Sequence, residues 1–314
     1  MKTTKEWNVA VVGAGTMGLG IALYFAMKGY QTSLFNRTSE NLERALQMIQ
    51  NNLATLVELD EVKAQDVGPI LARIKTTTNM QEAVEDADIV IESVTENVEI
   101  KKAVFAEMDR FAPKHAYLCS DTSSLNIYSF LETSRPEKTL ITHFFNPPHI
   151  MPLVEIVRED DTLDETVEII KDFLITAGKR PIVINKCIPG FVANRLTVAL
   201  AREAYYLVEN GHISFDDLDA IFTTTFGPRY VFEGIFDLYD QIGLDIGAIV
   251  AKGLIPQLCQ SKEPSPILLE KVKNNELGVK TGRGLKDYSG QDIKEIKRNR
   301  DIKIIKTLRH IETL

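Results

Sequence analysis

A glycine-rich hexapeptide at residues 13–18, GAGTMG, constrains the fold of this chain more than any other segment. It follows an apolar run at residues 9–12 and precedes a helical pattern at residues 19–28. In this setting Gly13 permits a tight turn, Gly15 lets the backbone approach a pyrophosphate, and Gly18 allows close packing of the helix. The N–H groups that begin such a helix can bind phosphate oxygens. The segment therefore predicts a dinucleotide-binding βαβ unit.

The residues after the second predicted strand bear on the choice of dinucleotide. A carboxylate at this place binds the ribose 2′-hydroxyl of NAD and would repel a 2′-phosphate. This chain has Asn36, Arg37 and Thr38 instead. Arginine and a hydroxyl can bind the 2′-phosphate of NADP, whereas Asn36 can equally bind the 2′-hydroxyl of NAD. We therefore expect NAD(P), with NAD as the default and NADP as a second candidate. The residues expected to bind it here are Gly13, Gly15, Thr16, Met17, Gly18, Asn36 and Arg37.

The first part of the chain alternates short β-branched runs with helical patterns. Strands are expected at residues 8–12, 32–35, 89–91, 116–119, 140–143, 153–157 and 181–184. Helices are expected between most of them, for example at 39–59, 98–111 and 163–177. This alternation is typical of an α/β fold with a doubly wound, mostly parallel sheet. After that point only helical patterns remain. We expect a dinucleotide-binding domain at 1–185 and an all-helical domain at 186–314.

Charge, cysteine content and the amino-terminal segment argue against several classes of protein. A net charge of −8 argues against a nucleic-acid-binding surface. The cysteines are odd in number and far apart, at Cys119, Cys187 and Cys259, so they form no disulfide framework or metal motif. The amino-terminal segment is too polar for a signal peptide, and its apolar run is too short to span a membrane. We expect a cytoplasmic protein that requires no metal and binds neither nucleic acid nor membranes.

A second informative segment, HFFNPPHIMPLVE, runs from His143 to Glu155. Prolines between the two ends prevent a helix and favour an irregular turn. The apolar flanks indicate strands, so a strand–loop–strand arrangement can bring His143 and Glu155 face to face. A carboxylate fixes the tautomer of a histidine and stabilises its charged form, as a general base requires. A structural histidine beside an unrelated surface glutamate is the alternative.

Several motifs, in this order, resemble those of the L-3-hydroxyacyl-CoA dehydrogenase family. They are GAGTMG at 13–18, ESVTEN at 92–97, SDTSSL at 120–125, HFFNP at 143–147, PLVE at 152–155, PGFVANR at 189–195 and KTGRG at 280–284. The resemblance covers nearly the whole chain. It implies a Rossmann-type domain followed by a helical domain, here residues 186–314, that serves in substrate binding and dimerisation. It also implies hydride transfer between a nicotinamide cofactor and the C3 hydroxyl or keto carbon of an L-3-hydroxyacyl substrate of fatty acid metabolism.

The resemblance also implies roles for individual residues. His143 would be the catalytic acid/base, with Glu155 as its partner. Ser123 would contact the substrate oxygen, and Asn194 would help to close the site from the second domain. Further cofactor contacts are implied at Glu96, Lys101, Asn146 and Lys280.

Some residues depart from the CoA-using pattern. Members that use CoA thioesters carry lysines in the helical region after the second strand, whereas here Lys63 is the only lysine of an acidic segment at 51–66. NPPHIMPLVE and GPRYVFEG at 227–234 are more similar to the λ-crystallin and carnitine dehydrogenase branch, which oxidises free 3-hydroxy acids. Arg229 of the second motif could hold a free carboxylate or form a structural ion pair. A gulonate- or carnitine-like free acid is therefore the alternative to a CoA thioester.

Two further alternatives remain. The chain could be a non-catalytic protein on a dehydrogenase scaffold, although His143, Glu155, Ser123 and Asn194 are all present. It could also belong with the β-hydroxyacid dehydrogenases related to 6-phosphogluconate dehydrogenase. Those enzymes rely on a lysine in the interdomain helix, and PGFVANR has none at the matching place.

Overall fold

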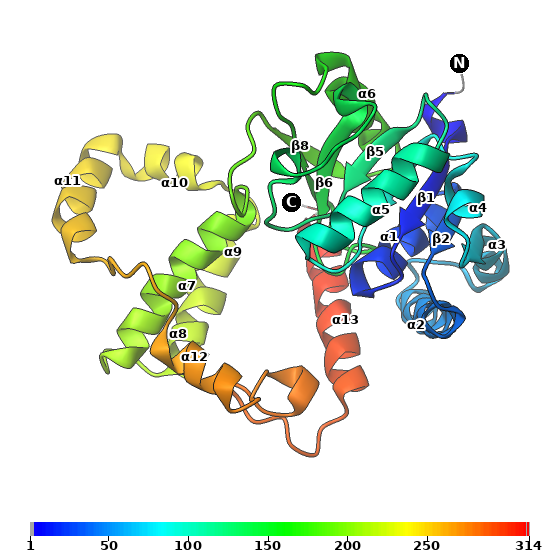
Figure 1. Ribbon diagram of the computed structural model, residues 1–314. Helices are drawn as coiled ribbons and strands as arrows, with labels where there is room; N and C mark the ends of the chain where they lie inside the picture. The colour runs from blue at the N-terminus through cyan, green and yellow to red at the C-terminus, as the bar shows by residue number, and fades with distance from the viewer. Residues whose placement is uncertain (1–2, 312, 314) are drawn as a thin grey trace. The chain divides into compact units, whose positions relative to one another are not determined.

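The structure is a computed structural model that describes residues 3–311 and residue 313. The chain divides into two compact units, Met1–Asn194 and Arg195–Leu314. The first unit contains a single twisted sheet covered by helices, and the second consists of helices and loops (Figure 1).

One eight-stranded sheet, with the order β3-β2-β1-β4-β5-β6-β7-β8, organises the first unit. Its strands are β1 Asn8–Val12, β2 Gln31–Phe35, β3 Ile74–Thr77, β4 Ile89–Glu92, β5 Tyr117–Ser120, β6 Thr139–Phe144, β7 Leu153–Val157 and β8 Arg180–Ile184. β7 pairs antiparallel with β6, and the other neighbouring pairs are parallel. The predicted Rossmann-type, mostly parallel sheet is confirmed.

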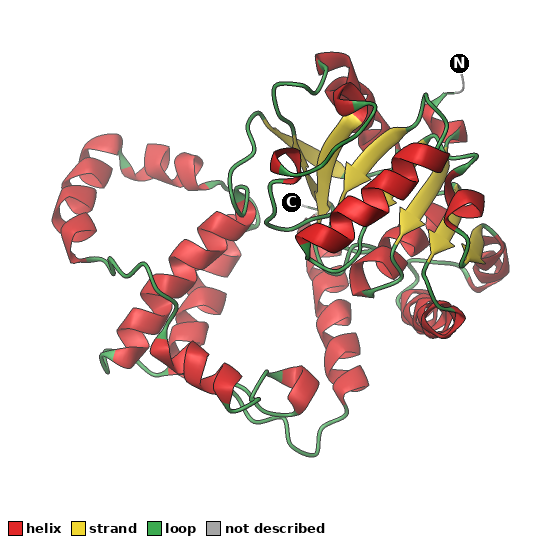
Figure 2. Cartoon of the chain, viewed as in Figure 1, coloured by secondary structure: helices red, strands yellow, loops and turns green. Residues whose placement is uncertain are grey.

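Helices lie on both faces of this sheet (Figure 2). They are α1 Thr16–Met27, α2 Ser39–Glu58, α3 Val67–Ala72, α4 Met80–Val84, α5 Val98–Phe111 and α6 Asp164–Thr176. Polar caps set the starts of α2 and α5, because the side chains of Thr38 and Asn97 accept hydrogen bonds from backbone N–H groups of the first turn. The apolar faces of these helices bury side chains such as Ile49 and Phe105 against the sheet.

The sheet order reverses direction at β1, which lies between β2 and β4. In open α/β sheets, ligands bind outside the carboxyl ends of the strands at such a point. The glycine loop follows the carboxyl end of β1, and Gly15 is the N-cap residue of α1. Helix α1 is almost entirely buried from Gly18 to Ala26, so the loop rests on a fixed element.

The second unit is helical, as predicted. Its helices are α7 Ala193–Glu209, which begins in the first unit, α8 Phe215–Ile221, α9 Gly227–Tyr230, α10 Ile235–Ile242, α11 Leu244–Leu254, α12 Pro266–Lys273 and α13 Ile293–Ile311. Helices α10 and α11 are separate, because the chain turns between them at Gly243, which has a φ of 92°. Glycine adopts such a φ without the steric cost that a β-carbon brings.

One strand of the sheet differs from the sequence-based expectation. Strand β3 was not predicted, because Ile74–Thr77 is short, contains only one apolar residue and lies at the edge of the sheet. In the part of the chain that the structure describes, no helix has the length and apolar character needed to cross a membrane.

Candidate active site

His143 and Glu155 lie directly opposite each other on the antiparallel strands β6 and β7. The Nδ1 atom of His143 is 2.8 Å from Oε2 of Glu155. Both residues are buried, with 6% and 3% of their surface exposed. The pairing follows from the register of the strands, because opposite residues of an antiparallel pair project to the same face. The structure thus brings together the two residues that the sequence singled out.

The second carboxylate oxygen of Glu155 is also occupied. Oε1 accepts hydrogen bonds from the backbone N–H groups of Val192 at 3.2 Å and Ala193 at 2.9 Å, where α7 begins. Burial raises the pKa of Glu155, but the hydrogen bond from His143 and those from the two N–H groups outweigh it and hold the pKa below its ordinary value. Glu155 is therefore ionised at neutral pH and held on two sides.

The other nitrogen of the His143 ring is the one left for proton exchange. A carboxylate can only accept, so Nδ1 carries the proton in the bond to Glu155 and Nε2 of the neutral ring is a base. The ring packs between aromatic side chains, with centroids 4.5 Å from Phe145 and 5.6 Å from Phe191. These contacts fix the direction in which Nε2 points.

The turn that carries Ser123 is held by Glu96. One oxygen of Glu96, Oε1, accepts from the Thr122 hydroxyl at 2.7 Å and from the N–H groups of Ser123 and Ser124 at 3.0 and 3.1 Å. The Ser123 hydroxyl is exposed, 3.3 Å from the same oxygen. Asn194 donates from Nδ2 to the Ser123 carbonyl oxygen at 2.9 Å, so these two predicted residues also lie together.

Lys101 is buried in an ion-pair network. Its Nζ atom lies 2.7 Å from Oε1 of Glu92 and 3.3 Å from Oε2 of Glu96, and its side chain is 1% exposed. Burial raises the pKa of Glu96, but the Thr122 hydroxyl, the Lys101 charge and the Ser123 N–H together hold it below its ordinary value. The contact of Glu96 and Lys101 with a cofactor stays a prediction. What the structure shows is that Lys101 fixes Glu96, and Glu96 fixes the serine turn.

The glycine loop fits a dinucleotide. A β-carbon at Gly13 would lie 2.3 Å from the Ser93 carbonyl oxygen, and one at Gly18 would lie 1.8 Å from the Gly13 oxygen. At Gly15, by contrast, a β-carbon would meet nothing within 4 Å. Gly13 and Gly18 are therefore required by the protein's own packing, whereas Gly15 borders open space at the start of α1. That space, beside helix N–H groups, is where a pyrophosphate would bind.

Two models of protein families match the chain. The "3-hydroxyacyl-CoA dehydrogenase, NAD binding domain" matches residues 8–187. The "3-hydroxyacyl-CoA dehydrogenase, C-terminal domain" matches residues 190–288. The chain belongs to the 3-hydroxyacyl-CoA dehydrogenase family. Membership makes it an oxidoreductase that acts on a CH–OH group with NAD.

Relatives within the 3-hydroxyacyl-CoA dehydrogenase family differ in substrate. The chain is 33% identical over 306 residues to 5-formyl-3-hydroxy-2-methylpyridine 4-carboxylate 5-dehydrogenase of Mesorhizobium japonicum, covering 97% of this chain and 98% of that protein. It is 36% identical over 289 residues to mitochondrial hydroxyacyl-coenzyme A dehydrogenase of Sus scrofa, covering 90% of this chain and 91% of that protein.

Two solved structures are also similar to the chain. The NAD⁺-dependent pyridine carboxylate dehydrogenase matches with a TM-score of 0.89 and 33% identity, over 98% of this chain and 99% of that chain. Mycobacterium tuberculosis FadB2 matches with a TM-score of 0.75 and 30% identity, over 90% of this chain and 99% of that chain.

Four other predicted site residues lie in separate parts of the chain. Asn146 follows β6 and precedes Pro147 through a cis peptide bond. Asn36 forms the turn into α2, where its Oδ1 accepts from the Thr38 N–H and the Asn41 side chain. Arg229 and Lys280 are exposed residues of the second unit. Their roles stay predictions.

Asp121 is a buried residue beside these groups that sequence reasoning missed. It follows β5, and its Oδ1 accepts from the Phe144 N–H at 2.9 Å while the Ser93 hydroxyl donates to Oδ2 at 2.9 Å. Asp121 thus links the segment beside the glycine loop to the residue after His143. Burial raises its pKa to about 8. Only its place inside the SDTSSL motif marked it, and nothing in the sequence shows that a carboxyl group there is enclosed.

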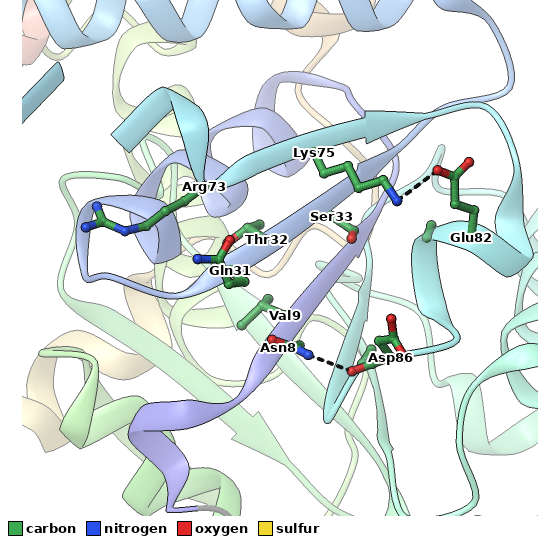
Figure 3. Close-up of a pocket in the computed structure, with 11 residues that line it drawn as sticks. Asn8, Val9, Gln31, Thr32, Ser33, Arg73, Lys75, Glu82 and Asp86 are labelled. Atoms are coloured by element: carbon green, nitrogen blue, oxygen red, sulfur yellow. Dashed lines mark hydrogen bonds and ion pairs between the residues drawn. The ribbon is translucent and has the colours of Figure 1, made fainter. Parts of the chain in front are cut away.

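A separate hollow of about 250 Å³ lies at the opposite ends of the strands. It is bordered by the first residues of β1, β2 and β3, and Figure 3 shows the Lys75–Glu82 ion pair at one side of it. Because the predicted family site is at the carboxyl ends of β1, β5 and β6, this hollow is not part of it.

Proposed function

We propose that the chain is a reversible dehydrogenase in which His143 and Glu155 form the acid/base pair. The observation that carries this proposal is the 2.8 Å contact between Nδ1 of His143 and Oε2 of Glu155, in a buried setting. It leaves Nε2 as the only ring nitrogen that can take a proton. Oxidation of a secondary alcohol requires removal of the hydroxyl proton as hydride leaves the carbon, and a positioned neutral histidine performs that step.

The neighbouring groups have complementary tasks in the proposed reaction. Ser123 holds the reacting oxygen through its exposed hydroxyl, and Glu155 stabilises the imidazolium that forms on His143. Asn194 keeps the serine turn in place through its bond to the Ser123 carbonyl oxygen. The nicotinamide cofactor, when bound, accepts the hydride. In the reduction direction the imidazolium returns its proton to the oxygen.

For the cofactor we propose NAD, bound by the glycine loop and the start of α1. The fit of Gly15 to a pyrophosphate supports a dinucleotide, and the family supports NAD. Arg37 is exposed beside Asn36, and it is the group that would bind a 2′-phosphate if NADP were also accepted. Titration of the protein with NADH and, separately, NADPH tests this: comparable affinities would overturn the preference for NAD.

For the substrate we propose a small free carboxylic acid with a hydroxyl or carbonyl group near the carboxylate. The exposed residues Asp60, Glu61 and Asp66 accompany the single Lys63 in the segment where CoA-using relatives carry lysines. This acidic surface repels the phosphates of CoA. The similarity to a pyridine carboxylate dehydrogenase over nearly the full length points the same way.

A 3-hydroxyacyl-CoA is the second candidate, because 36% identity links the chain to a hydroxyacyl-coenzyme A dehydrogenase. The test is steady-state kinetics with NADH and acetoacetyl-CoA, against NAD with free 3-hydroxy acids and hydroxylated aromatic carboxylates. A kcat/KM at least tenfold higher for a free acid supports the proposal. Higher kcat/KM for the CoA thioester would replace the first candidate with the second.

We also propose that a second copy of the chain covers the helical unit. No side chain of α7, α8, α10 or α12 is buried among the described residues. Large apolar side chains are instead exposed, among them Phe236 at 83%, Ile249 at 69% and Val198 at 66%. Apolar patches of this extent mark interfaces between proteins. Sedimentation equilibrium should give twice the chain mass, and a monomer at micromolar concentration would contradict the proposal.

A further inference from the structure

A buried lysine holds the loop that follows the His143 strand. Nζ of Lys179 donates to the carbonyl oxygens of Pro148 at 2.6 Å and Met151 at 2.7 Å. The same atom lies 3.6 Å from the centroid of the Tyr24 ring on α1. Lys179 itself is 5% exposed. One amino group therefore binds two points of the loop, Pro148 and Met151, and also contacts the helix that follows the glycine loop.

The loop also packs closely against the backbone of α1 at Gly20. A β-carbon at Gly20 would lie 2.6 Å from Cγ of Pro148 and 3.4 Å from Nδ1 of His149. Only a glycine allows this approach. The loop is thus held near α1 in two ways: it packs closely on Gly20, and it is hydrogen-bonded to Lys179, whose Nζ atom lies over the Tyr24 ring of α1.

Burying the amino group of Lys179 costs free energy, which favours a functional role for its contacts with the loop. Among the described residues, the polar partners of Lys179 are two carbonyl oxygens and no carboxylate, and a buried cation without a countercharge is costly. Burial, with repulsion from Lys28, lowers the pKa of Lys179 to about 7. Even the neutral amine has two N–H groups, which match the two carbonyl oxygens, so the contacts persist in both protonation states.

We propose that Lys179 is a positioning residue, which holds the loop from Asn146 to Met151 against α1 so that His143 and Asn146 keep their places relative to the bound cofactor. This inference rests on the proposed dehydrogenase function. Neither Lys179 nor Gly20 touches the reacting atoms in this scheme. They hold the loop after β6, the strand that carries His143, close to α1, the helix that follows the glycine loop.

Four variants test the inference: Lys179→Met, Gly20→Ala, the double variant, and Lys171→Met as a control. Methionine keeps the unbranched shape of the lysine side chain and removes the donors. Gly20→Ala disturbs the loop from α1 without altering Lys179, and alanine favours a helix. Lys171 is a partly exposed lysine of α6 that pairs with the exposed Glu168, so its replacement mainly removes a charge.

Each of the two single variants should lower kcat about tenfold to a hundredfold, since small displacements of reacting groups are costly. The double variant should lose less than the product of the two, because both act on one loop. Hydrogen exchange of the Ile150 and Met151 amides, which bond to the Pro147 carbonyl oxygen, should accelerate in each. Thermal unfolding measured alongside must show that the variants are folded at the assay temperature.

Two results would overturn the inference. One is unchanged exchange at Ile150 and Met151 in Lys179→Met, which would mean that the lysine does not hold the loop. The other is faster exchange with unchanged kcat and unchanged NADH affinity, which would make the contact structural only. If the unmodified protein turns over none of the substrates, the proposed function fails instead, and the loop contact is judged by exchange and NADH affinity.

Discussion

Glu155 lies opposite His143 across two antiparallel strands and binds its Nδ1 atom, while the second oxygen of Glu155 caps the start of α7. One carboxylate thereby fixes the ring of a candidate base and the chain segment that leads to Asn194. The arrangement makes the acid/base pair depend on three separate parts of the sequence: strand β6, strand β7 and the start of α7.

His143→Ala should lower kcat by about a hundredfold to ten-thousandfold, the usual contribution of a general base. NADH affinity should be unchanged within about twofold, because the glycine loop does not contact this side chain. Stopped-flow or steady-state turnover and fluorescence titration measure the two quantities. His115→Ala is the matched control, since that histidine is 65% exposed and bound to Asp88. Undiminished turnover in His143→Ala would remove the assignment.

Glu155→Gln should also lower kcat, through the tautomer of His143. The amide NH₂ would donate to Nδ1, which places the ring proton on Nε2 and removes the base. The backbone bonds from Val192 and Ala193 can persist, because the amide oxygen still accepts. A kcat close to that of the unmodified protein would show that the tautomer does not matter.

The same variant predicts a pH dependence of stability. The folded-state pKa of Glu155 is below its ordinary value of 4.5, so its stabilising effect is complete above that value and is lost as the pH falls through the lower folded-state pKa. At pH 7, Glu155→Gln should reduce the free energy of unfolding by about 1–3 kcal/mol. Urea denaturation at pH 7, 5 and 3.5 should show this difference shrinking at the lowest pH; a difference that grows on acidification would refute the account.

Lys101→Met should destabilise the first unit by about 3–5 kcal/mol, because it leaves the fully buried carboxylate of Glu92 without its cation. Lys102→Met is the control: that neighbour is 44% exposed and pairs with the exposed Glu99. Its effect should stay below about 1 kcal/mol. Equal effects of the two substitutions in urea denaturation would show that the buried pair is not a special contributor.

Gly15→Ala and Gly18→Ala should separate cofactor binding from folding. At Gly15 a β-carbon meets no protein atom within 4 Å and φ is −72°, so the fold should be retained while NADH affinity falls about tenfold or more. At Gly18 the β-carbon would meet the Gly13 oxygen at 1.8 Å, so stability itself should fall. Gly253→Ala, in open space on α11, is the control. Full NADH affinity in Gly15→Ala would contradict the proposed position of the pyrophosphate.

Much of the fold could be predicted because it depends on short-range patterns. The glycine loop after β1 and the change to helices after residue 184 are both local features. Short polar strands such as β3, and the turn at Gly243 that divides α10 from α11, were missed because pattern alone does not reveal edge pairing or a local left-handed φ. Tertiary pairing decides such segments.

The candidate site also has features that the sequence predicted and features that only the structure revealed. By itself the sequence placed His143 and Glu155 at the two ends of a proline-rich loop, and it supplied the motifs that contain Ser123 and Asn194. Only the tertiary structure showed that Glu96 holds the serine turn, that Lys101 is enclosed between two carboxylates, and that Lys179 binds the loop after His143. These contacts join residues far apart in the chain, and their strength depends on burial. Since burial is a property of the packed chain, residue type and spacing do not contain it.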